Sequence, residues 1–372
     1  MRSHSNSFTD YCVEMTKEFK TFTRATLDDA LTLVRERFPA HAQEIARQAL
    51  ENPSLSDGMG SGAIGYRDGR PVALQLGMPR KVYLGQDQIL GLVGGMTCKA
   101  LKGCPLSVLL ETIDRGCPLG GNVKISFGNT CCSSTSQMDE VNGAILGPAS
   151  CTNFRYAVIR VIDFVQYVIR RKIFRMGIPH WDDALPVGNA WSRRVGDIEV
   201  KREFSFCTES LSSFWTRYLR GNKGLVASRT PEELAWIFND RLVKSQCVLL
   251  GAYTRNECVG YIILTSPSAS ARRWCIGDMI ALRNDAEIIS VLLSSAKRFL
   301  RRCTPAFLFE TIGFPMCIQD TIALHMPFKR KVNCNFFSYA FADQDWKDRY
   351  SKLINSSVSW FFGPYDGDMC MA

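Results

Sequence analysis

The acidic residues close to the C-terminus are the first candidates for chemistry, because a positioned carboxylate can take up and release a proton. Asp366 and Asp368 lie beside Tyr365 and follow Trp360 in the segment WFFGPYDGD. An ending of this composition is suited to fold back over a cleft; the alternative is a docked tail that only closes the fold. We take Asp366, Asp368 and Tyr365 as candidate catalytic residues.

Other acidic and histidine side chains are weaker candidates for proton transfer. Glu111, Asp139 and Glu140 fall in expected helices, where a solvated position is the common explanation for a carboxylate. His180 and His325 are expected to be structural rather than catalytic. The sequence therefore contains no obvious general base outside its ending.

The cysteines do not form a metal-binding pattern. The chain has 15 cysteines, and Cys131 and Cys132 are adjacent instead of spaced as C-x-x-C. No closely spaced pair is matched by a second pair or by spaced histidines, as a zinc site requires. A chain of this length does not need disulfides for stability. We therefore predict reduced, buried thiols and no metal site.

The composition is that of a globular protein of about two domains. Of 372 residues, 46% are hydrophobic and 22% are charged, which is close to globular averages. The net charge of +9 is compatible with an anionic partner, such as a phosphate-rich cofactor, a nucleic acid or an anionic surface. Basic runs at 170–172, 301–302 and 329–331 are interpreted first as solvated helix ends or loops.

No segment approaches the roughly 20 uninterrupted apolar residues of a membrane helix. The most apolar stretch, 156–169, is interrupted by Arg160, Asp163 and Gln166. Residues 1–20 contain charges and hydroxyl groups where a secretory signal needs an apolar block. We therefore expect no membrane span, no export and a cytoplasmic location.

The first half of the chain alternates strands and helices. A short strand at 19–24 leads into an amphipathic helix that ends near residue 38. Two strands then flank an Asp68-Gly69 turn, which is typical of a β-hairpin. The remaining expected elements are a strand at 89–96, a helix at 106–115, a strand at 123–127, a short helix that ends at 142 and a final strand at 154–162.

The second half repeats this order after a turn-rich segment. Thr230 and Pro231 indicate a helix start. The elements expected after that helix are two hairpin strands at 247–253 and 258–264, a strand at 274–281, a helix at 286–302, a strand at 307–310, a short helix at 319–324 and a strand at 336–341. We predict a mixed α/β (α+β) fold of two domains, each a mostly antiparallel sheet flanked by helices. The predicted boundaries are 19–170, a linker at 171–200, and 201–372.

Several of these segments resemble the GNAT superfamily of N-acetyltransferases. Residues 22–30 (FTRATLDDA) resemble the opening of a GNAT domain, and the hairpin at 68–73 (DGRPVA) resembles its second and third strands. Residues 127–130 (FGNT), followed by Met138 and Asn142, are similar to a late segment of the family. More diverged likenesses occur at 249–253, 259–264, 336–339 and 360–368, the last being similar to the endings of tandem GNAT-like bacterial proteins.

The resemblance implies a loop that binds the pyrophosphate of coenzyme A through backbone N–H groups and a helix N-terminus. The corresponding residues are Lys102, Gly103, Cys104, Pro105, Leu106 and Ser107. Pro105 replaces a family glycine and has no N–H to donate, although a proline also begins a helix well. Binding of acetyl-CoA or a longer acyl-CoA therefore stays open at this loop. The equivalent loop at 282–286 has no glycine, and Asp285 would repel a pyrophosphate.

The resemblance also implies where the acyl group would lie. Gly95, Met96 and Thr97 would form the strand edge whose backbone N–H polarises the thioester oxygen. Asn129 and Ser133 would face the pantetheine end of the cofactor. These positions are carried over from the family and not worked out from spacing.

Three functions stay open. The leading hypothesis is an acyl-CoA-dependent N-acyltransferase that acts on an amine of a small molecule or a peptide. The second is a Fem-like transferase that uses aminoacyl-tRNA, with which the net positive charge agrees. The third is a non-catalytic GNAT-fold protein that binds a metabolite or a partner, which Pro105 and the lack of an evident base favour.

Overall fold

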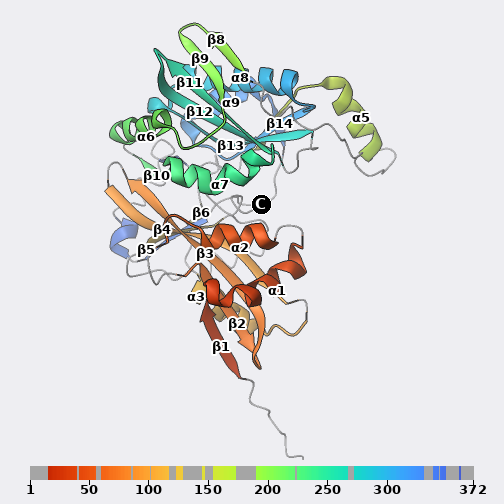
Figure 1. Ribbon diagram of the computed structural model, residues 1–372, viewed down its shortest axis with the longest axis vertical. Coiled ribbons are helices and arrows are strands. Elements are labelled where there is room, and N and C mark those ends of the chain that lie inside the picture. Colours follow the sequence, from red (N-terminus) through yellow and green to blue (C-terminus); the bar gives the residue numbers. More distant parts are fainter. Residues whose placement is uncertain are drawn as a thin grey trace, which may run out of the picture.

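The computed structural model describes residues 16–39, 42–55, 60–84, 87–100, 102–116, 123–128, 145–146, 154–172, 190–222, 224–266, 272–330, 338–342, 344–348 and 360–361. In this part of the chain, two β-sheets are each covered by helices (Figure 1). Most strand pairs are antiparallel. The predicted mixed α/β fold class is therefore confirmed.

The first sheet is built mainly from the N-terminal half of the chain. Its strand order is β1-β2-β3-β4-β5-β16-β6, and β10 pairs with both β3 and β17. Its strands are β1 (Lys17–Thr21), β2 (Gly62–Arg67), β3 (Arg70–Leu84), β4 (Asp87–Lys99), β5 (Val123–Gly128), β6 (Ile145–Leu146), β10 (Leu225–Ala227), β16 (Ser338–Phe341) and β17 (Trp360–Phe361).

The second sheet is built mainly from the C-terminal half. Its strand order is β15-β7-β14-β13-β12-β11-β9-β8. Its strands are β7 (Phe154–Val158), β8 (Ser192–Val195), β9 (Ile198–Glu203), β11 (Cys247–Thr254), β12 (Glu257–Thr265), β13 (Arg273–Ala281), β14 (Leu308–Ile312) and β15 (Phe328–Arg330).

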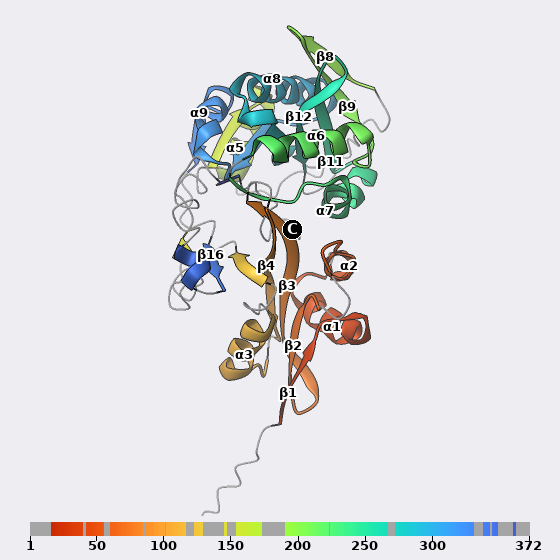
Figure 2. The same ribbon diagram turned by 90° about the vertical axis from the view of Figure 1, so that its left-hand side faces the viewer.

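Helices cover both faces of the first sheet (Figure 2). The helices of this half are η1 (Arg24–Thr26), α1 (Leu27–Arg37), α2 (Ala42–Leu50) and α3 (Leu106–Gly116). A methyl group added at Gly65 of β2 would lie 2.2 Å from the Thr112 hydroxyl of α3. The next residue, Tyr66, donates a hydrogen bond to Asp29 of α1 at 2.6 Å. Because successive strand residues point to opposite faces, α3 and α1 lie on opposite sides of the sheet.

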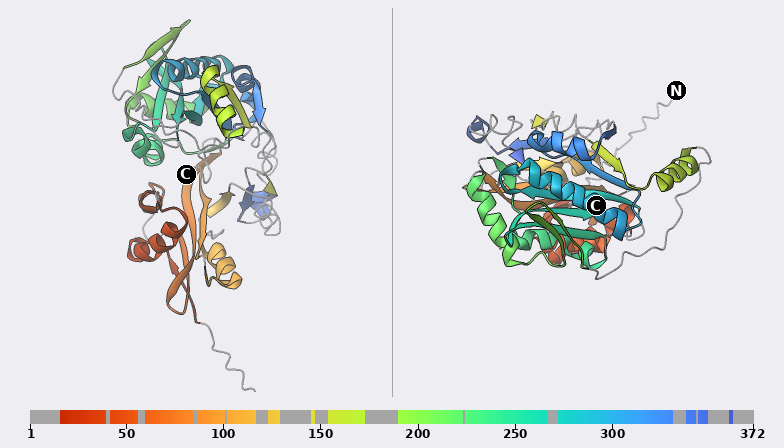
Figure 3. Two further views of the ribbon diagram at one scale, coloured as in Figure 1. Left: turned by 90° about the vertical axis from the view of Figure 1, so that its right-hand side faces the viewer. Right: turned by 90° about the horizontal axis from the view of Figure 1, so that it is seen from above.

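The second sheet is covered in the same way. Its helices are α5 (Val161–Lys172), which extends away from the sheet (Figure 3), α6 (Glu209–Gly221), α7 (Pro231–Val243), η3 (Leu282–Asn284), α8 (Ala286–Cys303) and α9 (Met316–His325). On β12, a methyl group at Gly260 would lie 3.1 Å from Ile288 of α8. The adjacent Tyr261 packs edge-on against Phe214 of α6, with ring centroids 5.7 Å apart. α8 and α6 therefore occupy opposite faces.

Each sheet takes strands from the other half of the chain. β7 lies between β14 and β15 in the second sheet, and β16 pairs with β5 in the first. The prediction that residues 154–162 close the first sheet and 336–341 the second is wrong. The alternating pattern of a strand fixes which side chains face the core, whereas its partner depends on which sheet edge lies open. The domain boundaries at 170 and 201 stay a prediction.

α7 connects the two halves. The Trp236 indole donates to the Gln48 carbonyl oxygen of α2 at 2.7 Å. The buried Glu233 carboxylate lies 3.5 Å from the buried Arg80 guanidinium of β3 and accepts from Ser54 at 2.8 Å. One cluster of buried apolar side chains runs through both halves. None of the described helices has the length and apolarity required to cross a membrane.

Candidate functional site

β4 carries a bulge at the residues predicted to contact an acyl group. On β3 the pairing steps from Gly77 to Gln75, while on β4 it steps from Gly94 to Thr97. β4 therefore contains one extra residue within Gly95–Met96, directly before Thr97. A bulge interrupts the hydrogen-bond ladder and redirects backbone N–H and C=O groups. Such a strand edge can offer an N–H to a ligand.

The edge of β4 that faces β5 is paired over only part of its length. Parallel pairing runs from Leu90 and Val123 to Gly94 and Gly128. Beyond the bulge, β4 continues to Lys99 with a partner only on the β3 side, within the residues that the structure describes. Asn129 and Ser133, predicted to face the pantetheine end of the cofactor, lie outside those residues.

The loop after β4 leads directly into the N-terminus of α3. Gly103 has a φ of +88°, a left-handed conformation that favours glycine. The Pro105 carbonyl accepts from the Val108 and Leu109 N–H groups, each at 3.1 Å. Pro105 thus precedes the first helical residue, and its missing N–H removes no donor from the first turn. The N–H groups of Leu106 and Ser107 belong to the turn whose donors have no intrahelical acceptor.

Basic side chains from three strands and the loop gather around this helix start. Lys17 of β1 donates to the Ser107 hydroxyl at 3.1 Å, and Arg67 of β2 donates to the Gly103 carbonyl at 3.2 Å. Lys102 is exposed. Burial raises the pKa of the Cys104 thiol, and the nearby ammonium of Lys99 acts in the opposite direction. Sequence reasoning identified Lys102 but missed Lys17 and Arg67.

These residues fit the phosphate part of coenzyme A. A pyrophosphate needs N–H donors at a helix N-terminus and cations nearby, and the loop supplies both. Leu106 and Leu110, one helical turn apart, are 68% and 42% exposed on α3. An exposed apolar strip beside the cations suits a ligand that has apolar parts as well as phosphates.

The second sheet also has a bulge, in β13, and a buried network of protein side chains lies beside it. Pairing steps from Ile263 to Leu264 on β12 and from Asp278 to Ile276 on β13, so β13 has one extra residue. The Asp278 carboxylate is buried. It accepts from Arg229 at 2.9 and 3.2 Å and from the Tyr261 hydroxyl at 2.7 Å.

The helix N-terminus that follows β13 is occupied by a carboxylate. Asp285 accepts from the N–H groups of Glu287 and Ile288 at 2.8 and 3.2 Å. These are the donors that a bound phosphate would need. The structure thus gives the physical reason why the loop at 282–286 is unsuited to a pyrophosphate.

The remaining candidates are placed as follows. Asp366, Asp368 and Tyr365 lie outside the described residues, as do Asp139, Glu140 and His180. Glu111 is exposed on α3 and pairs with Arg115 at 2.7 Å. His325 bonds to Ser290 at 2.8 Å and joins α9 to α8. No group of three His, Cys, Asp or Glu side chains that could hold a metal ion occurs in the described part of the chain.

Comparison with known proteins gives likenesses of structure and none of sequence. No protein-family model matches the chain, and the search of curated proteins finds no match. A GCN5-related N-acetyltransferase from Anabaena variabilis has a TM-score of 0.56 at 10% identity, covering 89% of this chain and 74% of that one. One from Kribbella flavida has a TM-score of 0.54 at 14% identity, covering 90% and 73%.

The N-myristoyltransferase of Saccharomyces cerevisiae with bound myristoyl-CoA has a TM-score of 0.50 at 11% identity, covering 88% of this chain and 78% of that one. At such identities the likeness establishes the fold and no more. The fold of this chain is similar to that of these GCN5-related N-acetyltransferases, as the sequence resemblance predicted.

Proposed function

We propose that this protein is an acyl-CoA-dependent N-acyltransferase whose donor site lies on the first sheet. The acceptor would be an amine of a small molecule or a peptide. The amine nitrogen attacks the thioester carbonyl, a C–N bond replaces the C–S bond, and the amine proton leaves to a base while the thiolate takes up a proton. Acetyl-CoA or a longer acyl-CoA is the donor.

The observation that carries this proposal is the combination of the bulge in β4 with the loop at 102–107. The bulge offers a strand edge for the thioester oxygen, and the loop offers a helix N-terminus with Lys17, Arg67 and Lys102 around it for the phosphates. The second sheet repeats the bulge, but there Asp278 next to it is buried and bonded to Arg229 and Tyr261. We therefore assign the donor to the first sheet and a part in forming the acceptor cleft to the second.

We further propose Asp366, Asp368 and Tyr365 as the proton-transfer groups. Support comes from β17, which pairs in parallel with β10, Leu225 opposite Trp360. β10 in turn pairs with β3. Trp360 and Phe361 therefore belong to the first sheet, and Tyr365, Asp366 and Asp368 follow them closely in the sequence.

A thermal-shift measurement with acetyl-CoA and with longer acyl-CoAs tests the donor site. A ligand that binds the folded state at 100 times its Kd stabilises it by about 2.7 kcal/mol. We expect Gly103→Glu to abolish the shift, because it places a side chain on a left-handed residue and a carboxylate among the phosphate donors. Gly196→Glu is the matched control, since Gly196 also has a positive φ of 57° and open space around its Cβ position, but lies in the turn between β8 and β9.

The outcomes distinguish the three functions. If no acyl-CoA raises the melting temperature, even at concentrations well above the micromolar range, the proposal is abandoned. A shift with aminoacyl-tRNA in its place would support the Fem-like transferase. A shift with acyl-CoA but no transfer to any amine would support a non-catalytic binding protein. Equal loss of the shift in both glycine variants would remove the loop at 102–107 from the site.

A further inference from the structure

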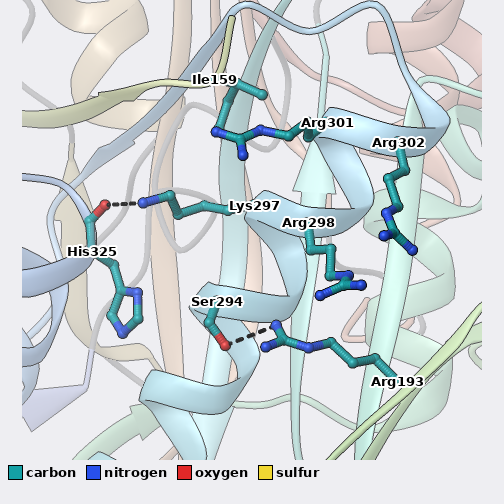
Figure 4. Close-up of a pocket in the computed structure, with 8 residues that line it drawn as sticks. All are labelled: Ile159, Arg193, Ser294, Lys297, Arg298, Arg301, Arg302 and His325. Carbon is teal, nitrogen blue, oxygen red and sulfur yellow. Dashed lines mark hydrogen bonds between the residues drawn. The ribbon is translucent and has the colours of Figure 1, made fainter.

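A groove of basic side chains lies along α8, away from the proposed donor site (Figure 4). Its cavity has a volume of about 420 Å³, within the range of about 300–1,000 Å³ that is typical of small-molecule sites. It is lined by Ile159, Arg193, Ser294, Lys297, Arg298, Arg301, Arg302 and His325. We call these residues the α8 groove.

The charge of the α8 groove is not balanced by acids. Five of its lining residues are Lys or Arg, and none is Asp or Glu. Within the described part of the chain, no ion pair involves any of these five cations. By contrast, Arg273 pairs with Glu310 at 2.7 Å and Arg229 with Asp278 at 2.9 Å. Unpaired cations gathered in one concavity favour an anion.

The cations of the groove also repel one another. The pKa of Arg193 is lowered by burial and then by Arg298, and that of Lys297 by burial and then by Arg301. Burial and Lys297 together lower the pKa of His325. An anion in the groove would relieve this repulsion.

The position of the cations is only partly explained by the helix itself. Cations stabilise the last turn of a helix through its macrodipole, which accounts for Arg301 and Arg302 near the end of α8 at Cys303. It does not account for Lys297 and Arg298 further back, or for Arg193, which comes from β8 and bonds to Ser294 at 3.2 Å. Residues of separate elements have been brought to one site.

We propose that the α8 groove binds a small molecule that carries several phosphate groups. The planar fork of arginine matches phosphate oxygens in pairs, and the several cations match a ligand of several negative charges. The lining contains no Phe, Tyr or Trp ring on which successive bases could stack, which argues against single-stranded nucleic acid. Free polyphosphate compounds and phosphorylated lipid headgroups share this chemistry. The site is independent of the proposed acyl transfer.

The test uses the full chain and inorganic tripolyphosphate as the probe, titrated by calorimetry at constant ionic strength. We expect the double variant Arg298→Gln/Arg302→Gln to bind at least about tenfold more weakly. The control double variant Arg194→Gln/Arg220→Gln removes the same net charge from exposed positions outside the groove and should bind as the parent does. The melting temperature and the circular dichroism spectrum without ligand should be the same in all three proteins, which shows that they fold.

The source of the phosphates is decided by a second arm. The protein is sedimented with phosphatidylcholine vesicles that contain phosphatidic acid. If the parent and the control variant sediment with the vesicles and the groove variant does not, the ligand is a lipid headgroup. If the parent binds tripolyphosphate but does not sediment with the vesicles, the ligand is a free compound. The proposal is overturned if tripolyphosphate does not bind, or if both double variants weaken it equally. It is also overturned if a single-stranded RNA oligonucleotide binds the groove more tightly than tripolyphosphate.

Discussion

Replacing Asp278 by asparagine is the sharpest test of the claim that a buried ion pair lies beside the bulge of the second sheet. Asp278 is 4% exposed and Arg229 is 3% exposed. The substitution keeps the shape of the side chain but removes its charge and sets an amide N–H₂ group toward the guanidinium. Arg229 then remains buried without its carboxylate.

The expected loss follows from burial. Removing one partner of a buried ion pair destabilises a protein by about 3–5 kcal/mol, because the other charge is left without compensation. That is a large fraction of the about 5–15 kcal/mol that stabilises a typical domain. Glu111→Gln on α3 is the control, since its pair with Arg115 is as short, at 2.7 Å, but 41% and 54% exposed. An exposed pair is worth about 0–1 kcal/mol.

Urea unfolding followed by tryptophan fluorescence and by circular dichroism measures both losses, and coincident transitions justify a two-state treatment. The double variant Arg229→Met/Asp278→Leu should be more stable than Asp278→Asn, because it removes both charges. A loss below about 1 kcal/mol for Asp278→Asn, equal to that of the exposed control, would refute the reasoning. Such a result would mean that Asp278 and Arg229 are solvated instead of buried beside the bulge. The assignment of the acyl donor to the first sheet would then lose the difference between the two sheets on which it rests.

Two further predictions concern single titratable groups. Burial raises the pKa of Cys258 and of Cys275 to about 12. In the native protein at pH 8, iodoacetamide should therefore label the exposed Cys207 and leave Cys258 and Cys275 unlabelled. Peptide mass spectrometry measures the labelling, and a Cys275 labelled as fast as Cys207 would contradict this. The pKa of His325 is lowered by burial and by Lys297. Below about pH 6.5 the unfolded state therefore binds a proton more readily than the folded state does, and the stability decreases as the pH is lowered. The melting temperature should therefore drop more between pH 7.5 and pH 5 in the parent than in His325→Gln, and equal drops would argue against a lowered pKa.

Local features of the fold could be predicted because they depend on few residues. The Asp68-Gly69 turn adopts positive φ values of 50° and 73°, as the hairpin signal requires. Thr230 caps α7 by accepting from the Glu233 N–H at 3.3 Å. Each of these interactions joins residues close in sequence, so the pattern of side chains is sufficient to specify it.

Features set by distant residues were missed or misplaced. β3 runs past Pro79 to Leu84, although a proline usually ends a central strand, because β4 pairs with it throughout and β10 with its last residues. α2 and α6 were not predicted. The adjacent glycines Gly94 and Gly95 were a usable signal for the bulge, whereas Lys17 and Arg67 reach the loop at 102–107 only because β1 and β2 lie beside β3 in the sheet.

The strand exchange bears on how the two halves can share one reaction. β7 completes the second sheet beside β14, and β16 extends the first sheet beside β5. Dividing the chain at residue 170 would therefore take β7 from the second sheet and β10, β16 and β17 from the first. It would also break the contact of α7 with Arg80. The bulge occurs in both sheets, but only the first combines it with a helix N-terminus that carries no carboxylate cap among the described residues. We therefore propose that the two sheets of this interlocked chain have different roles. The first sheet, whose backbone N–H groups at the start of α3 carry no carboxylate cap in the described part of the chain, would hold the acyl-CoA.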